Sequence, residues 1–215
     1  MPWQPFELHA ERYDRWFDEE PGRSIFPSEV AAIRLVLKDT HGPRLEVGVG
    51  TGRFASELEV TLGLDPSREV LRVARRRGVE VVQGVGEALP FADASFGAAL
   101  FIATLCFLDD AMAALREAIR VLRPGGSLVL ADVIADSPWG RLYLEQKRAG
   151  HPFYAEAAFF TLEDLYYLLD DVGLKVTSSV STLVQPPDTA GIVAEQPIHR
   201  LVREASFVCL RAELG

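Results

Sequence analysis

Three alternate glycines follow a short apolar stretch that has the pattern of a buried strand, within residues 45–54. Because Gly48, Gly50 and Gly52 have no Cβ, the chain can turn sharply there and bring its backbone N–H groups against a ligand. A helical pattern follows, and the N-terminus of such a helix would point at the same ligand. The combination is typical of a loop that binds a nucleotide cofactor.

The spacing of these glycines excludes one familiar nucleotide-binding loop and departs from another. No Gly-Lys-Ser/Thr follows, so the phosphate-binding P-loop is excluded. The dinucleotide fingerprint G-x-G-x-x-G/A needs a small residue where this chain has Arg53. The loop therefore differs from the one that binds NAD in its usual form.

An acidic residue ends the next strand pattern along the chain. Residues 60–65 end in Asp65, which Pro66 and Ser67 follow. A carboxylate at the end of the neighbouring strand can accept hydrogen bonds from both hydroxyls of a ribose. Asp65 is therefore a candidate ribose ligand.

Strand and helix patterns alternate along the chain, which indicates a mostly parallel sheet with helices on both faces. Strands are predicted at residues 44–49, 60–65, 79–83, 98–103, 127–133, 174–182 and 203–211. Helices are predicted at residues 26–39, 53–59, 67–77, 110–122 and 161–172. We interpret residues 1–215 as a single domain, with a loop at residues 185–197 between the last two strands.

Four segments, in this order, resemble the motifs of one family. They are residues 45–54, residues 63–67, residues 84–91 with Ser95-Phe96, and residues 122–128. Together they resemble the class I S-adenosylmethionine-dependent methyltransferases, in the Methyltransferase type 11-like branch that acts on small molecules. The resemblance covers roughly the first two thirds of the chain.

The resemblance implies a Rossmann-like, mostly parallel seven-stranded sheet with helices on both faces and an antiparallel last strand. It implies that S-adenosylmethionine is the cofactor, with its methionine part at the glycine loop, its ribose at Asp65 and its adenine at the loop after Gly84. Glu46 either orients the amino group of the cofactor or only braces the loop. The expected cofactor-binding residues are Glu46, Gly48, Val49, Gly50, Gly52, Asp65, Pro66, Ser67, Gly86, Glu87, Ala88, Ala103 and Thr104.

Two positions depart from the family pattern. Val85 stands where relatives often have an aspartate that faces the adenine amino group, and Gly97 stands where they usually have another aspartate. We therefore expect adenine to be held mainly by backbone groups around Gly86, Glu87 and Ala88.

Two aromatic-rich segments are candidates for a lid over the methyl acceptor. The N-terminal region, residues 1–40, includes a run that resembles the leading Tyr-Asp-x-Trp-Phe element of this branch, and residues 136–160 are inserted after the fifth strand. The alternative for both segments is that their aromatic rings only pack on the edge of the domain. The acceptor-binding candidates are Tyr13, Trp16, Phe17, Tyr143, Lys147, His151 and Tyr154.

Methyl transfer to a nucleophile needs alignment and exclusion of water more than it needs a covalent catalyst. The sequence does not identify a catalytic residue, and the candidates for a proton acceptor are Tyr13 and His151. Cys106 lies just past the fourth predicted strand between apolar residues, so we interpret it as a buried, unreactive thiol. The chemical nature of the acceptor atom, N, O, S or C, stays open.

Composition limits the partners. The net charge of −9 provides no surplus of Lys and Arg for nucleic-acid phosphates, and we interpret the one basic run, residues 72–77, as a solvated helix face. The two cysteines are far apart with no Cys/His cluster, so neither a disulfide framework nor a metal site is predicted. No signal peptide or apolar run of about 18 residues occurs, so we expect a cytoplasmic protein without membrane attachment.

We conclude that the sequence predicts a methyltransferase acting on a small molecule. Two alternatives remain at this stage. One is an NAD-dependent oxidoreductase that uses the same loop, and the other is a non-catalytic protein that binds S-adenosylmethionine. The oligomeric state is not predicted.

Overall fold

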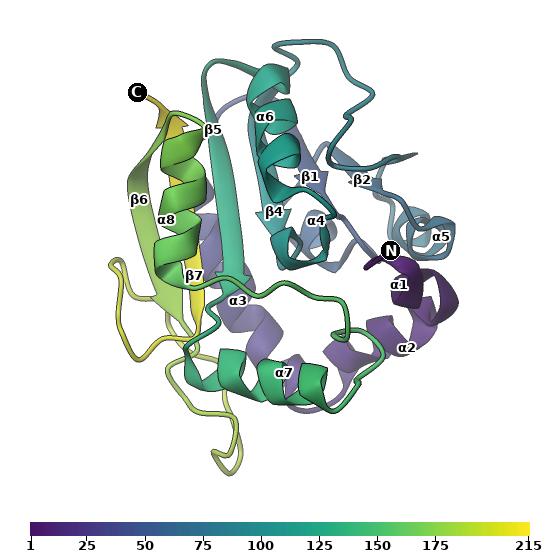
Figure 1. Cartoon of the computed structure of the whole chain (residues 1–215), viewed down its shortest axis with the longest axis vertical. Helices are drawn as coiled ribbons and strands as arrows, with labels where there is room; N and C mark the ends of the chain where they lie inside the picture. Colours follow the sequence, from purple (N-terminus) through teal and green to yellow (C-terminus); the bar gives the residue numbers. More distant parts are fainter.

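The computed structural model describes residues 1–215 and contains a seven-stranded sheet with the strand order β3-β2-β1-β4-β5-β7-β6 (Figure 1). β1 to β5 are parallel, and β7 lies antiparallel between β5 and β6. This confirms the Rossmann-like sheet with an antiparallel last strand. The strands are β1 Arg44–Val47, β2 Leu62–Asp65, β3 Val81–Gln83, β4 Phe96–Ile102, β5 Leu122–Val133, β6 Leu174–Thr182 and β7 Phe207–Leu214.

The helices cover both faces of the sheet and its carboxyl edge. They are α1 Gln4–Leu8, α2 Ala10–Arg15, α3 Gly22–Leu37, α4 Arg53–Glu57, α5 Arg68–Arg76, α6 Ala111–Val121, α7 Pro138–Arg148 and α8 Leu162–Asp171, with 3-10 turns at Trp16–Asp18 and Leu105–Phe107. α6 and α8 pack on one face of the sheet, and α3 and α4 pack on the other. No helix combines the length and apolar character of a membrane-spanning segment.

Residues of the central strand β4 face the two layers alternately. Ala99 and Phe101 belong to the core under α6 and α8, whereas Leu100 and Ile102 belong to the core under α3. This alternation follows from the two-residue period of a strand, and it explains why β4 reads as a continuous apolar run.

Several predicted boundaries were wrong. The last strand begins at Phe207, not at residue 203, because the chain is still turning at residues 203–206 and first pairs where Phe207 lies opposite Val133. α3 begins at Gly22, not at residue 26, and Pro27 lies inside the helix. β5 begins at Leu122 and carries a register shift across the turn at residues 123–126.

Three helices were not predicted from the sequence: α1, α2 and α7. All three lie beyond the carboxyl ends of the parallel strands. In Figure 1, α7 lies below β5, and α2 and α1 lie to its right, with α1 just below α5. α1 and α2 are too short for a periodic pattern to develop, so their position depends on tertiary contacts. Their place at this edge matters because ligands of open α/β sheets bind there, next to the point where the strand order reverses. In this sheet the reversal lies between β1 and β4.

Gly97, the second departure from the family pattern, has a steric explanation. A Cβ at this position would lie 1.6 Å from the carbonyl oxygen of His41 and 3.3 Å from the Cα of Gly42. The backbone of the loop before β1 therefore occupies the space that any side chain at residue 97 would need. The glycine serves packing at the amino end of β4, away from the carboxyl edge.

We expect Gly97→Ala to lower the free energy of unfolding by about 3 kcal/mol, at the upper end of the cost of overpacking, because a backbone carbonyl cannot move aside like a flexible side chain. Gly150→Ala is the comparison, since Gly150 has a left-handed backbone (φ +75°) but open space around its Cα. Its expected cost is about 1 kcal/mol. Urea unfolding of both variants checks the difference, and equal losses would contradict the steric argument.

Candidate functional site

The glycine loop between β1 and α4 has the backbone conformation that its sequence predicts. Gly48, Gly50 and Gly52 all have positive φ values, of +75°, +53° and +77°. A Cβ on Gly48 would lie 2.3 Å from Cγ2 of Thr104, at the end of β4. The loop therefore lies closer to the neighbouring strand end than any residue with a side chain allows.

Asp65, at the end of β2, supports this loop. Its carboxylate accepts hydrogen bonds from the backbone N–H groups of Gly50 at 3.0 Å and Ser67 at 2.9 Å. Burial raises the pKa of Asp65 to about 6, against these hydrogen bonds, which lower it. Asp65 thus braces the glycine loop and also faces the cavity beside it.

The first cavity at the carboxyl edge has a volume of about 80 Å³ and lies over the glycine loop. We call it the cofactor cavity. Its lining includes most of the expected cofactor-binding residues: Gly48, Gly50, Asp65, Pro66, Gly86, Glu87, Ala103 and Thr104. Trp3, Phe6 and Tyr13 of the N-terminal segment cover this cavity and form its roof. Of these three residues, only Tyr13 was a candidate from the sequence, and it was expected to bind the acceptor or accept a proton.

The other expected cofactor-binding residues lie behind this lining. The hydroxyl of Ser67 caps α5 and donates to Glu7 of α1 at 2.7 Å. Gly52 packs against Ala74, and Val49 is buried in the small core under α5. Ala88 and Glu46 also lie outside the lining. These residues shape the cavity wall but do not form its surface.

Glu46 is buried, at 1% exposure, and its Oε2 has no hydrogen-bond partner. Burial raises the pKa of this carboxyl well above its usual range, with a further contribution from the charge of Asp65. A buried polar atom without a partner is costly, so its presence at the end of β1 calls for a donor that the chain itself does not supply.

The second cavity is larger, about 760 Å³, and lies between the N-terminal segment, α3, β5 and α7. We call it the acceptor cavity. Of the expected acceptor-binding residues, its lining contains Tyr13, Trp16, Phe17, Tyr143, His151 and Tyr154. Lys147 is the exception, because its ammonium group donates to the carbonyl oxygen of Ala157 and it does not line the cavity.

Aromatic rings form much of the wall of the acceptor cavity. Tyr154 packs against Tyr143 with ring centroids 5.0 Å apart and stacks on His151 at 4.7 Å, and Phe159 stacks on Tyr143 at 6.1 Å. Burial lowers the pKa of His151, helped by the nearby charge of Arg12, so the imidazole is neutral at pH 7. The two candidate lid segments therefore supply cavity walls as well as core packing.

Two acidic residues in the acceptor cavity were not predicted from the sequence. Glu29 of α3 and Asp132 of β5 line the cavity and are each 7% exposed. Burial raises the pKa of Glu29 to about 8, helped by the charge of Asp132, and burial raises the pKa of Asp132 to about 7. Each of these acids interrupts an otherwise apolar pattern in the sequence, which could have marked it as a candidate site residue. A single sequence does not show that the two line the same cavity.

The two cavities are adjacent. Phe6, Tyr13, Ala103 and Phe107 line both of them. Ala103, which follows β4, has a left-handed backbone with φ +46°, an uncommon conformation that is often found at functional sites.

Cys106 also lines the acceptor cavity, and burial raises the pKa of its thiol well above its usual range, which agrees with an unreactive cysteine.

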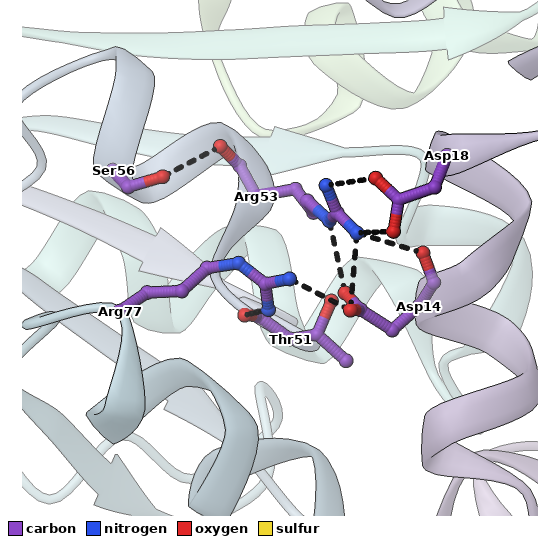
Figure 2. A network of polar contacts seen from close by, with 6 residues as sticks. All are labelled: Asp14, Asp18, Thr51, Arg53, Ser56 and Arg77. Carbon is purple, nitrogen blue, oxygen red and sulfur yellow. Dashed lines mark hydrogen bonds and ion pairs between the residues drawn. The ribbon is translucent and has the colours of Figure 1, made fainter. Parts of the chain in front are cut away.

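A network of charged side chains fastens the N-terminal roof to the glycine loop (Figure 2). Asp14 of α2 accepts hydrogen bonds from Arg53 Nε at 3.0 Å and from Arg77 Nη2 at 2.7 Å, and Asp18 pairs with Arg53 at 2.6 Å. Arg77 also donates to the carbonyl oxygen of Thr51 at 2.7 Å. The network explains why an arginine occupies position 53, and it shows that Arg77 is not part of a solvated face.

Comparison with known proteins agrees with this geometry. A family model described as "Methyltransferase domain" matches residues 45–130, the part of the chain from β1 into β5. An uncharacterized protein of Mycobacterium tuberculosis is 45% identical over 94% of this chain and 71% of its own length. An O-methyltransferase of Aspergillus nomiae is 31% identical over 83% of this chain and 84% of its own length.

A solved structure from Thermotoga maritima, described as a S-adenosylmethionine-dependent methyltransferase and possible histamine N-methyltransferase, is similar throughout. It is 37% identical, the alignment covers 98% of both chains, and the TM-score is 0.90. The present chain belongs to the class I S-adenosylmethionine-dependent methyltransferases. This family membership argues against the NAD-dependent oxidoreductase, and it favours an enzyme over the non-catalytic binding protein.

We expect Asp14→Asn to lower the free energy of unfolding by about 1–3 kcal/mol, between the values for exposed and buried ion pairs, because Asp14 is 17% exposed and holds two arginines. The matched control is Glu57→Gln, which removes an ion pair to Arg34 whose side chains are 56% and 51% exposed. Its expected effect is below about 0.5 kcal/mol. Urea unfolding measures both, and equal effects would mean that the network of Figure 2 contributes no more than a surface pair.

The raised pKa values predict the pH dependence of stability. Glu29, Asp132 and Asp65 hold their protons to pH values of about 8, 7 and 6 in the folded chain, whereas unfolded carboxyls lose theirs near pH 4. The folded state therefore binds more protons in this window, and the free energy of unfolding should fall as pH rises from about 5 to about 8.

Glu29→Gln should flatten this fall by about 1–3 kcal/mol, since one pKa unit is worth 1.36 kcal/mol and part of the shift relaxes. The exposed acid Glu19, which also lines the acceptor cavity, provides the control variant Glu19→Gln, whose slope should match that of the unmodified protein. Thermal unfolding of the three proteins between pH 5.5 and 8.5 checks this. An unchanged slope in Glu29→Gln would reject the raised pKa.

Proposed function

We propose that this chain transfers the methyl group of S-adenosylmethionine to a small molecule held in the acceptor cavity. One observation carries the proposal: the cofactor cavity and the acceptor cavity meet at Phe6, Tyr13, Ala103 and Phe107. A methyl group presented from the first cavity would therefore reach a nucleophile in the second without either ligand crossing solvent.

The residues present fit S-adenosylmethionine. The carboxylate oxygen of Glu46 that lacks a partner lies behind the cavity lining and is suited to the ammonium group of the cofactor through water. The carboxylate of Asp65, which is in the lining, is suited to the ribose hydroxyls. Asp65 can accept hydrogen bonds from a ribose and keep those from Gly50 and Ser67, because a carboxylate has about four acceptor sites.

The adenine would lie against the loop after β3. Gly86 lines the cavity, and a Cβ there would lie 3.0 Å from Cγ1 of Val47, so this backbone approaches the cavity closely. The side chain of Glu87 accepts from the backbone N–H groups of Asp109 and Asp110, at 3.0 and 3.2 Å, and is thus occupied in bracing the wall. This supports the expectation that backbone groups hold the adenine.

The cofactor supplies an electrophilic methyl group when bound, and the protein supplies the geometry. The glycine loop and Asp65 fix the donor, and the aromatic walls orient the acceptor toward the junction. Phe6 and Tyr13, which line both cavities, would limit the access of water to the junction. Such positioning supplies most of the rate enhancement that a reaction of this kind needs.

The size and lining of the acceptor cavity support a small organic molecule. Its volume of about 760 Å³ is in the range of small-molecule sites. The relatives named above differ in acceptor atom, one being an O-methyltransferase and the other a possible histamine N-methyltransferase, so they support a small acceptor without choosing between oxygen and nitrogen.

We expect Asp65→Ala to weaken the binding of S-adenosylhomocysteine by about 1.5–3 kcal/mol, through loss of charge-assisted hydrogen bonds to the ribose. Asp170→Ala serves as the control, because Asp170 is an exposed acid on α8, on the opposite side of the sheet from the glycine loop and α4. Isothermal titration calorimetry on both variants measures the difference. An unchanged affinity in Asp65→Ala would reject this place for the ribose.

A preliminary measurement tests the cofactor itself. A ligand at 100 times its Kd stabilises the folded state by about 2.7 kcal/mol, so S-adenosylhomocysteine should raise the thermal midpoint, whereas NAD at the same concentration should not. A shift with NAD alone would contradict the proposal.

A further inference from the structure

The acceptor cavity contains two buried carboxyl groups without a cationic partner. Glu29 makes no hydrogen bond or ion pair within the chain, although 93% of its surface is covered, and it lines the cavity. The carboxylate of Asp132 accepts a hydrogen bond only from the backbone N–H of Val133, at 2.9 Å. Buried acids are normally paired, so two unpaired acids on one cavity are an exception that needs an explanation.

The basic residues near the cavity do not compensate these charges. Arg12 and Arg15 line it but are exposed, and the guanidinium of Arg12 lies over the ring of Phe153, 5.9 Å from its centroid. Lys147 is directed to the carbonyl oxygen of Ala157. The interior of the cavity is therefore acidic, and its cations are at the rim.

The remaining groups that face Glu29 are uncharged at neutral pH. Tyr13 of α2, Tyr143 of α7, Tyr154 and Cys209 of β7 lie close enough for the charge of Glu29 to influence their pKa values, all of which are raised, with burial as the main cause. Phenol rings beside carboxylates favour a cation in two ways, since the faces of the rings attract positive charge and the hydroxyls accept hydrogen bonds.

We propose, building on the methyl transfer proposed above, that the acceptor is a small organic amine whose ammonium group binds between Glu29 and Asp132 and is enclosed by Tyr143 and Tyr154. A neutral phenol or alcohol would leave the buried acids without a cationic partner, and a carboxylate would bring a further negative charge next to them. The cavity thus selects amines by charge and excludes anions by repulsion.

The same acids account for the proton that the amine must lose. An ammonium group has no lone pair, so one N–H proton moves to a carboxylate oxygen of Glu29 or Asp132, which leaves a neutral amine and a carboxyl group. The nitrogen lone pair then forms the C–N bond to the methyl group while the S–CH3 bond breaks and its electron pair stays on sulfur. The products are a methylated ammonium ion and neutral S-adenosylhomocysteine. The raised pKa values, about 8 for Glu29 and about 7 for Asp132, suit a proton acceptor at neutral pH.

The test is calorimetric binding of matched probes to the protein saturated with S-adenosylhomocysteine. The probes are 2-phenylethylamine, 4-phenylbutylamine and tryptamine, each compared with the alcohol of the same skeleton. We expect at least one amine to bind 10-fold or more tighter than its alcohol, and to bind more tightly at pH 8.5 than at pH 6, because the carboxyls lose their protons in this range while the amine stays charged.

Variants then assign the effect to the acids. Glu29→Gln and Asp132→Asn should each reduce amine affinity 10-fold or more and should flatten its pH dependence, while alcohol binding changes less than 2-fold. Asp170→Asn, at an exposed acid of α8 that does not line the cavity, should leave amine affinity within 2-fold. Binding of S-adenosylhomocysteine to each variant shows that the site is folded.

The outcomes separate the two proposals. If the protein does not bind S-adenosylhomocysteine, the proposed function fails. If S-adenosylhomocysteine binds but no amine binds more tightly than its alcohol, or the amine preference survives both substitutions, the amine acceptor is rejected while methyl transfer stands. Methylation of the preferred amine, detected by release of S-adenosylhomocysteine, would support both proposals if it is lost in Glu29→Gln and Asp132→Asn but not in Asp170→Asn.

Discussion

The carboxylate of Asp14 joins three parts of the chain that the rest of the site depends on. It belongs to the N-terminal segment, Arg53 begins the helix after the glycine loop, and Arg77 follows α5. Burial alone would raise the pKa of Asp14, but hydrogen bonds from both arginines outweigh it and the pKa is lowered. Without this contact, helices as short as α1 and α2 would have little reason to stay over the sheet edge.

The carboxyl edge of the sheet, which the N-terminal segment covers, contains buried acidic side chains. Glu46 and Asp65 lie on the cofactor side, and Glu29 and Asp132 lie on the acceptor side, all of them buried. Each carboxyl group is costly to bury in its ionised form, and the raised pKa values express that cost. A donor that carries an ammonium and a sulfonium group, together with an acceptor of positive charge, would offset it. The charge of the site is thus opposite to the charge of the ligands assigned to it.

How much of this could be predicted from the sequence depends on the distance over which each signal acts. The glycine loop, Asp65 and the alternation of strands and helices are local patterns, and the structure has the predicted fold and brings the loop and Asp65 together. Glu29 and Asp132 line the same cavity although they are far apart in the chain, and so are Asp14 and Arg53, which form an ion pair. A single sequence has no local pattern that indicates such long-range contacts. Lys147 is a different case. Its segment lies beside the acceptor cavity as expected, but its side chain is directed to the carbonyl oxygen of Ala157 and not into the cavity.

The excursion between β6 and β7, residues 183–206, reaches the acceptor cavity and pairs with the sheet at an isolated bridge between Ile198 and Ser181 of β6. Its Pro187 lines the cavity, the carbonyl of Gln185 accepts from the indole of Trp139 at 2.8 Å, and the N–H of Glu195 donates to Ser28, the neighbour of Glu29, at 2.8 Å. Its two ends are fixed by the antiparallel pairing of β6 with β7. Changes in length or composition within this excursion would therefore reshape the acceptor side while leaving strand register and the glycine loop as they are. If the acceptor binds in this cavity as proposed, a change in a single surface segment would alter which molecule is methylated while the residues around the methyl donor stay the same.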